Sequence, residues 1–234
     1  MIQQFINDLQ LPLSKERLEA YRPDQGSDLA MVVNYFWNLR LCEALYPTLN
    51  AVEIALRNSI NSALNNYYNN EYWFEGEWTN NSLLVESTQY TQIEDARSKL
   101  RKRNSEENPG RIVAELSFGF WVGLLNRPYE EKIWSLNDYA LLRIVFPAAR
   151  RRDRKRSLLR DRFAVINDLR NRVFHYEPIG YRKTLGQEHA NILQAIGWIS
   201  PVMRDSIKLY DRFPDVYNTG REQVEADIKQ YLGI

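Results

Sequence analysis

The sequence contains one cysteine, Cys42, and two histidines, His175 and His189, among 234 residues. A single cysteine cannot form a disulfide within the chain, and it excludes a zinc site built from several thiolates. We interpret Cys42 as a small buried apolar residue. The histidines are 14 residues apart, and neither lies among carboxylates at metal-ligand spacing. The sequence therefore predicts no metal and no cofactor, and His189 is expected at the surface or at a helix cap.

The chain also lacks long apolar runs. No segment reaches the roughly 18 consecutive apolar residues that a membrane-spanning helix needs. The first residues, MIQQFINDLQLPLSKERL, have neither the charged start nor the long apolar core of a signal peptide. We therefore expect a cytoplasmic protein with no membrane partner.

The formal net charge is only +1, but the charge is unevenly distributed. Eight Arg and Lys residues lie between positions 150 and 162, against two acidic residues. Such a run either forms a solvated helix face or attracts a polyanion. The candidate RNA-binding residues from this run, together with one further arginine, are Arg151, Arg152, Arg154, Arg156 and Arg172.

Apolar residues recur at helical spacing along the chain, and no alternating strand pattern stands out. The prediction is an all-α bundle formed by a single domain, residues 1–234, with residues 1–26 as an N-terminal extension. Pro47 is expected to separate two helices, and Pro201 to kink another. Residues 65–81 are rich in Asn, Tyr and Trp and are expected to form a loop. Their aromatic rings can stack on bases or fill the side of the bundle.

One stretch, residues 158–178, carries the most information. Its apolar residues form a stripe at spacings of four, three and seven: Leu159, Phe163, Ile166 and Val173. Arg170 occupies the position that completes this stripe, where an ionised guanidinium is costly unless a partner compensates it. Pro178 is expected to end the helix at Glu177, which places His175 in the last turn.

The spacing within this stretch raises a geometric problem. On an ideal helix, side chains five residues apart diverge by about 140°, so Arg170 and His175 point apart. Asn171 and His175, four residues apart, lie nearly above one another. Either the helix distorts near its end, or two copies of the chain meet and form a composite site about a two-fold axis.

Arg170 and His175 frame the string R-N-x-x-x-H, which resembles the R-x(4–6)-H signature of HEPN ribonucleases. Three longer segments resemble the Abi-like family of abortive-infection proteins within that superfamily. They are NDLRNRVFHYEPI (167–179), ELSFGFWVGLL (115–125) and FWNLRLCEALYPTLNAVEIALRNSI (36–60).

This resemblance implies a HEPN-like helical bundle with additional peripheral helices, a homodimer with paired active sites, and an endoribonuclease of toxin or phage-defence type. It implies three catalytic residues: Arg170, Asn171 and His175. It also implies a supporting role for an acidic residue followed by Arg-Asn on an earlier helix: Glu53, Arg57 and Asn58. From the residues alone, Glu53 and Arg57 at i, i+4 form a surface ion pair.

These residues suffice for RNA cleavage without a metal. The ribose 2′-OH attacks the adjacent phosphate, His175 transfers protons, and Arg170 stabilises the charge that develops. DNA lacks the 2′-OH and is spared. Three alternatives stay open. The protein can be a non-catalytic HEPN-like module that binds RNA or nucleotide, or an interaction subunit controlled by a neutralising antitoxin or another regulatory partner. Alternatively, Arg170 pairs with a buried carboxylate and His175 caps the helix.

Overall fold

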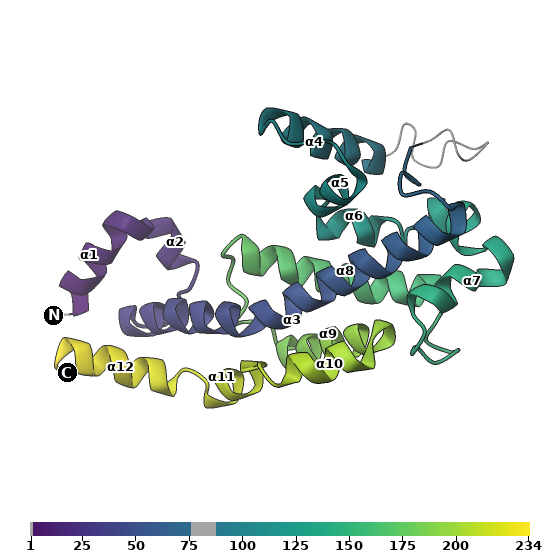
Figure 1. Ribbon diagram of the computed structural model, residues 1–234. Helices are drawn as coiled ribbons and strands as arrows, with labels where there is room; N and C mark the ends of the chain where they lie inside the picture. Colours follow the sequence, from purple (N-terminus) through teal and green to yellow (C-terminus); the bar gives the residue numbers. More distant parts are fainter. Residues whose placement is uncertain (1, 76–87) are drawn as a thin grey trace. The chain divides into compact units, whose positions relative to one another are not determined.

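A computed structural model describes residues 2–75 and 88–234 (Figure 1). Its helices, in chain order, are α1 (Ile2–Leu13), α2 (Lys15–Glu19), α3 (Asp28–Tyr68), α4 (Thr88–Lys102), α5 (Pro109–Glu115), α6 (Phe118–Gly123), the 3₁₀-helix η2 (Arg127–Tyr129), the π-helix η3 (Glu130–Trp134), α7 (Leu136–Val145), α8 (Arg156–Phe174), α9 (Leu185–Ile199), α10 (Pro201–Lys208), α11 (Phe213–Thr219) and α12 (Glu222–Leu232).

The all-α prediction is confirmed, since 74% of the structure is helical and the described ranges contain no strand. Within those same ranges, no helix combines the length and the apolar character that crossing a bilayer requires.

The contacts group the chain into two compact units. The first comprises the residues up to Leu49, Asp168–Ala190 and Ile207–Ile234. The second comprises Asn50–Asn167 and Asn191–Ser206. Residues 1–26, predicted as an extension, belong to the first unit.

The first unit combines an apolar core with buried amides. Its fully buried residues come from several helices and include Leu18, Met31, Leu41, Leu45 and Leu185. Asn34 and Asn38 on α3 are also buried, at 3% and 1% exposure. Buried amides are costly without hydrogen-bond partners. Asn34 Nδ2 donates to the Tyr21 carbonyl at 2.9 Å, and the partners of Asn38 are described below.

The second unit has an aromatic core in which Trp73 and Trp121 contact each other, with ring centroids 6.3 Å apart. Trp73 is 1% exposed, and its Nε1–H donates to Asn61 Oδ1 at 2.9 Å. Trp73 and the buried Phe74 therefore fill the side of the core, one of the two roles predicted for aromatics of this stretch. The predicted loop starts later than expected because α3 continues to Tyr68, and its part from residue 76 onward lies outside the described residues.

Two predictions about proline are wrong. Pro47 lies inside α3 and does not end it. The fully buried Leu45 and Leu49 flank it, so packing on both sides outweighs the missing N–H, and Thr48 Oγ1 donates to the Leu45 carbonyl at 3.0 Å. Pro201 does not kink a helix but begins α10, because α9 has already ended at Ile199.

Candidate active site at the end of helix α8

The apolar stripe of α8 is completed by Leu169 and not by Arg170. Leu169 is fully buried, as are Leu159 and Phe163, and it follows Ile166 by three residues and precedes Val173 by four. A stripe completed by Leu169 fits helical periodicity as well as a stripe completed by Arg170 does. The interpretation that Arg170 occupies a core position is therefore wrong: Arg170 lies at the edge of the stripe, half-buried.

Helix α8 ends at Phe174, three residues before Glu177, where Pro178 was expected to end it. The N–H of Glu177 donates to the carbonyl of Arg172 at 2.9 Å, and the N–H of Tyr176 donates to that of Val173 at 3.3 Å. Tyr176 has a φ of 59°. This is a Schellman cap with a tyrosine in the left-handed position that usually holds glycine. His175 is thus the C-cap residue just outside the helix, and its side chain is exposed.

Arg170, Asn171 and His175 are connected within this last turn. Arg170 Nη1 donates to Asn171 Oδ1 at 3.4 Å, and the Asn171 carbonyl accepts the N–H of His175 at 2.8 Å. The Arg170 guanidinium also lies 4.4 Å from the ring centroid of Phe174. The helical bond pattern is regular up to His175 and gives way to the cap immediately after it, so the first of the two alternatives, a distortion that brings the Arg170 and His175 side chains together, stays a prediction. The second alternative, a second copy, stays a prediction.

The segment that follows His175 is fixed to α3 by side-chain amides and hydroxyls. Asn38 Nδ2 donates to the Glu177 carbonyl at 3.3 Å, while Asn38 Oδ1 accepts from the N–H of Ile179 at 2.7 Å. The Tyr21 hydroxyl donates to the Tyr176 carbonyl at 3.1 Å. A buried, satisfied polar network of this kind fixes one backbone conformation, so the turn that carries His175 is held on its C-terminal side.

Arg172, predicted to bind RNA, is engaged by carboxylates of the same unit. Its Nε lies 3.3 Å from Asp168 Oδ2, and its Nη1 lies 2.9 Å from Glu177 Oε2. Arg182 also contacts Asp168, at 3.2 Å. Because two carboxylates already compensate Arg172, its charge contributes less to an anion site than the sequence suggests.

The predicted supporting residues belong to the second unit, on the part of α3 that follows Leu49. Arg57 Nε donates to Asn58 Oδ1 at 3.1 Å. Glu53 and Arg57 are half-buried, and Asn58 is exposed. Their supporting role stays a prediction.

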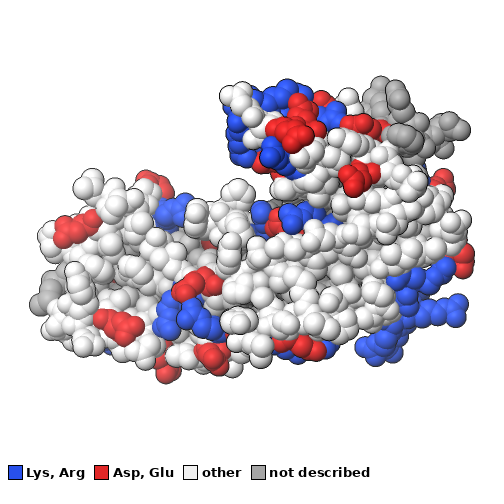
Figure 2. All heavy atoms as spheres, in the orientation of Figure 1, with Lys and Arg blue, Asp and Glu red and all other residues white. Residues whose placement is uncertain are grey.

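The first part of the basic run, residues 150–155, forms a turn before α8, and its later arginines lie on α8 itself. We name residues 150–155 the basic turn. The side chains of Arg150, Arg151 and Arg152 are exposed. The turn borders a cavity of about 720 Å³, which is lined by Asp138, Tyr139, Arg143, Arg151, Arg152, Arg154 and Lys155. Figure 2 shows basic side chains gathered on this part of the second unit, below α7. Such a concentration of cations attracts anions.

Arg156 differs from the other arginines of the run. Its side chain is only 11% exposed. Its Nε lies 2.8 Å from Glu130 Oε2, and its Nη1 donates to the Leu125 carbonyl at 2.6 Å. We therefore assign Arg156 to the packing of the second unit and not to the cationic surface.

His189 is not at the surface, contrary to expectation: it is 5% exposed, and its ring stacks on Phe213 with centroids 4.4 Å apart. Its Nε2 lies 2.9 Å from Asp211 Oδ2. Burial lowers the pKa of His189, and the nearby Asp211 carboxylate opposes that effect.

Cys42 is only partly buried, and burial raises the pKa of its thiol to about 11.

Comparison of the chain with protein-family models, with curated proteins and with solved structures found no match. The likeness to the Abi-like family therefore rests on the three sequence segments. Among the described residues, no three His, Cys, Asp or Glu side chains form a group that can hold a metal ion.

Two neighbours of the candidate site were missed by sequence reasoning, Phe174 and Asn38. Phe174 follows Arg170 by four residues, and that spacing on a helix places a ring beside a guanidinium. A local signal for Phe174 was thus present. Asn38 acts through contacts with residues 177–180, about 140 positions away, and nothing local in the sequence indicates that pairing.

Proposed function

We propose that the protein is a metal-independent endoribonuclease of the toxin or abortive-infection type, acting in the cytoplasm, with Arg170, Asn171 and His175 as catalytic residues. The observation that carries the proposal is the end of α8, where Arg170 contacts Asn171 and an exposed His175 follows at the cap. A guanidinium, an amide and an imidazole in one turn supply an anion contact, a hydrogen-bonding group and a proton carrier.

The reaction proceeds by attack of a ribose 2′-OH on the adjacent phosphate. The 2′-oxygen forms a bond to phosphorus as its proton leaves, and the bond to the 5′-oxygen breaks as that oxygen gains a proton. The products are a 2′,3′-cyclic phosphate and a 5′-hydroxyl. His175 transfers these protons, and Arg170 stabilises the charge on the phosphorane. We also propose a homodimer in which the Arg170–His175 pairs of both copies face a shared groove.

The basic turn supplies sequence-independent contacts to the RNA backbone, in our proposal through Arg151, Arg152 and Arg154. These side chains line the cationic cavity. Phosphate contacts of this kind give affinity without selecting a sequence. We also propose that a neutralising antitoxin or another regulatory partner controls the activity.

The deciding experiment is incubation of end-labelled RNA with the purified protein in EDTA, beside a DNA strand of the same sequence. We expect cleavage of RNA only, with ends that carry cyclic phosphate. His175→Gln serves as the matched variant, because the side chain is exposed and its loss leaves the core intact. RNA that is bound but left intact by the wild type would instead favour a non-catalytic HEPN-like binding module.

A further inference from the structure

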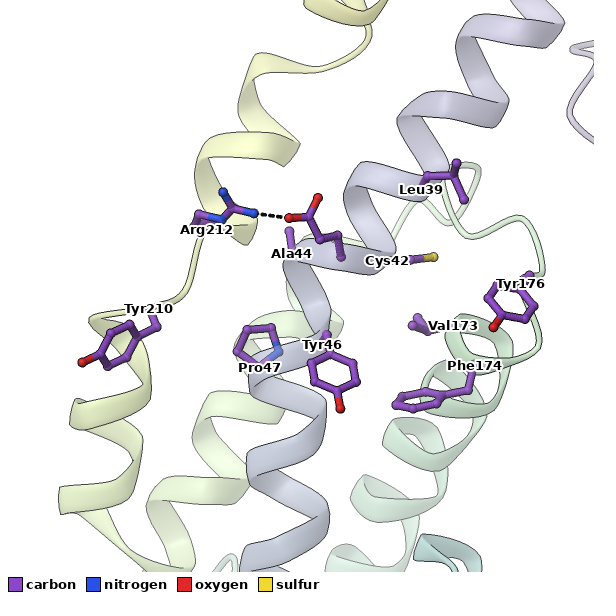
Figure 3. A pocket seen from close by; sticks show the side chains of 11 residues that line it. Leu39, Cys42, Ala44, Tyr46, Pro47, Val173, Phe174, Tyr176, Tyr210 and Arg212 are labelled. Atoms are coloured by element: carbon purple, nitrogen blue, oxygen red, sulfur yellow. Dashed lines mark hydrogen bonds and ion pairs between the residues drawn. The ribbon is translucent and has the colours of Figure 1, made fainter.

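A cavity of about 540 Å³ lies beside the candidate site, within the first unit. Its walls come from α3, from the end of α8 with Tyr176, and from the segment around Tyr210. Figure 3 shows Tyr46 of α3 and Phe174 of α8 on facing helices, with Tyr176 on the turn that follows α8. A volume of this size is typical of a small-molecule site.

Three partly exposed aromatic side chains line this wall. The rings of Tyr46 and Phe174 lie 5.8 Å apart at an angle of 34°. Tyr46 is 53% exposed, Phe174 37% and Tyr176 65%. Partly exposed aromatic side chains around one cavity suit a nucleobase, because every base can stack on an aromatic ring.

Phe174 connects this cavity to the proposed chemistry. It lines the cavity, and its ring also contacts the Arg170 guanidinium at 4.4 Å. Tyr176, on the same wall, directly follows His175. A nucleotide carries its base one sugar away from its phosphate, so a phosphate held by Arg170 places a base within reach of Phe174.

The rest of the cavity suits a base better than a charged ligand. Val173, Ala44 and Leu39 provide aliphatic contacts. The Cys42 thiol, with its pKa raised to about 11, remains neutral at physiological pH. Glu43 and Arg212 form an ion pair among the lining residues and are 67% and 65% exposed. This pair offers both an acceptor and donors to the edge of a base.

We propose that this cavity binds the nucleobase next to the scissile phosphate and thereby selects the cleavage site. The selection of a cleavage site rests on the proposed ribonuclease function. The binding of a base rests only on the aromatic residues that line the cavity. The base stacks on Tyr46, Phe174 supports the Tyr46 ring from the side, and Glu43 contacts the edge of the base.

The test uses the intact protein carrying His175→Gln, a variant designed to prevent cleavage, and a short RNA with a single 2-aminopurine. Stacking quenches the fluorescence of this base. We expect saturable quenching, weakened about tenfold or more by Tyr46→Leu and kept by Tyr46→Phe. Tyr231→Leu, at a 77% exposed tyrosine of the same unit, serves as the control for the loss of a surface ring.

In the cleaving protein, Tyr46→Leu raises KM and flattens the base preference at the cleavage site, and Glu43→Gln changes which base is preferred. Quenching and cleavage pattern that are both unaffected by Tyr46→Leu would overturn the proposal while leaving the ribonuclease intact. Conversely, if quenching depends on Tyr46 but the wild-type protein never cuts RNA, the base site is supported and the catalytic function is ruled out.

Discussion

The Arg170 guanidinium lies 4.4 Å from the ring centroid of Phe174, one helical turn away on α8. This contact holds a cation over an aromatic face at the point where the helix ends. Such a cation–π contact restricts the orientation of the guanidinium that we propose as the phosphate contact.

His175→Ala is expected to lower the rate of RNA cleavage by about 10²–10⁴-fold, because the variant removes the proposed proton carrier. The thermal midpoint should stay within a degree or two, since the side chain is exposed. Initial rates and thermal melts of both proteins check this. A folded variant that cleaves as fast as the wild type would show that His175 is not catalytic.

Replacing Arg151, Arg152 and Arg154 together by Gln should weaken RNA binding and reduce its dependence on salt. Each lost phosphate contact removes about 0.7 from the slope of log K against log salt for single-stranded RNA. The measurement is a titration of labelled RNA at several salt concentrations. An unchanged slope would mean that the basic turn does not contact RNA.

Arg156→Gln is the matched control for that experiment, since it removes one charge from the same run. The variant loses the ion pair with Glu130 and the hydrogen bond to the Leu125 carbonyl. We therefore expect it to lower the free energy of unfolding by about 1–3 kcal/mol. Its effect on the salt slope should be small.

The cap of α8 offers a test of the turn itself. Tyr176 adopts a φ of 59°, which costs a residue with a Cβ about 1 kcal/mol relative to glycine. Tyr176→Gly should therefore unfold at a higher urea concentration than Tyr176→Ala, because both variants lose the ring and only one keeps the strain. Equal stabilities of the two variants would contradict the Schellman cap.

Much of the fold was predictable because apolar spacing is a local signal. The same signal failed at Arg170, where Leu169 and Arg170 fit the stripe equally well and only burial distinguishes them. Pro47 was misjudged because tertiary packing outweighed its intrinsic effect on a helix. The anchoring by Asn38 was not predictable, since it depends on contacts distant in sequence.

His189 is expected to make stability depend on pH. Burial lowers its pKa below the ordinary value, so in acid the unfolded chain binds a proton that the folded chain resists. Stability should therefore be retained above about pH 6.5 and fall as the pH drops below it. Urea unfolding at pH 7.5 and pH 5.5 measures the difference. His189→Gln should make the stabilities at the two pH values more similar. If the variant shows the same difference between pH 7.5 and pH 5.5 as the wild type, other groups cause the effect.

The last prediction concerns a homodimer whose contact includes residues 159–176. Because the apolar stripe of α8 is buried within the chain, only the outer face of the helix is available to a second copy. Leu158 and Val165 lie on that face, seven residues apart, and are 47% and 44% exposed. Val165→Lys, within that range, should shift the mass measured by light scattering from dimer to monomer. Ile144→Lys, at a 57% exposed residue of α7, is the control.

Mixing chains tests whether the site is composite. In an equal mixture of Arg170→Ala and His175→Ala chains, half of the dimers contain one of each. If each cleft takes Arg170 from one chain and His175 from the other, such a dimer has one complete cleft, and activity recovers to about a quarter of the wild-type value. If each chain provides its own pair, every cleft lacks one residue and mixing restores nothing. A monomeric wild type at micromolar concentration would rule out the dimer altogether.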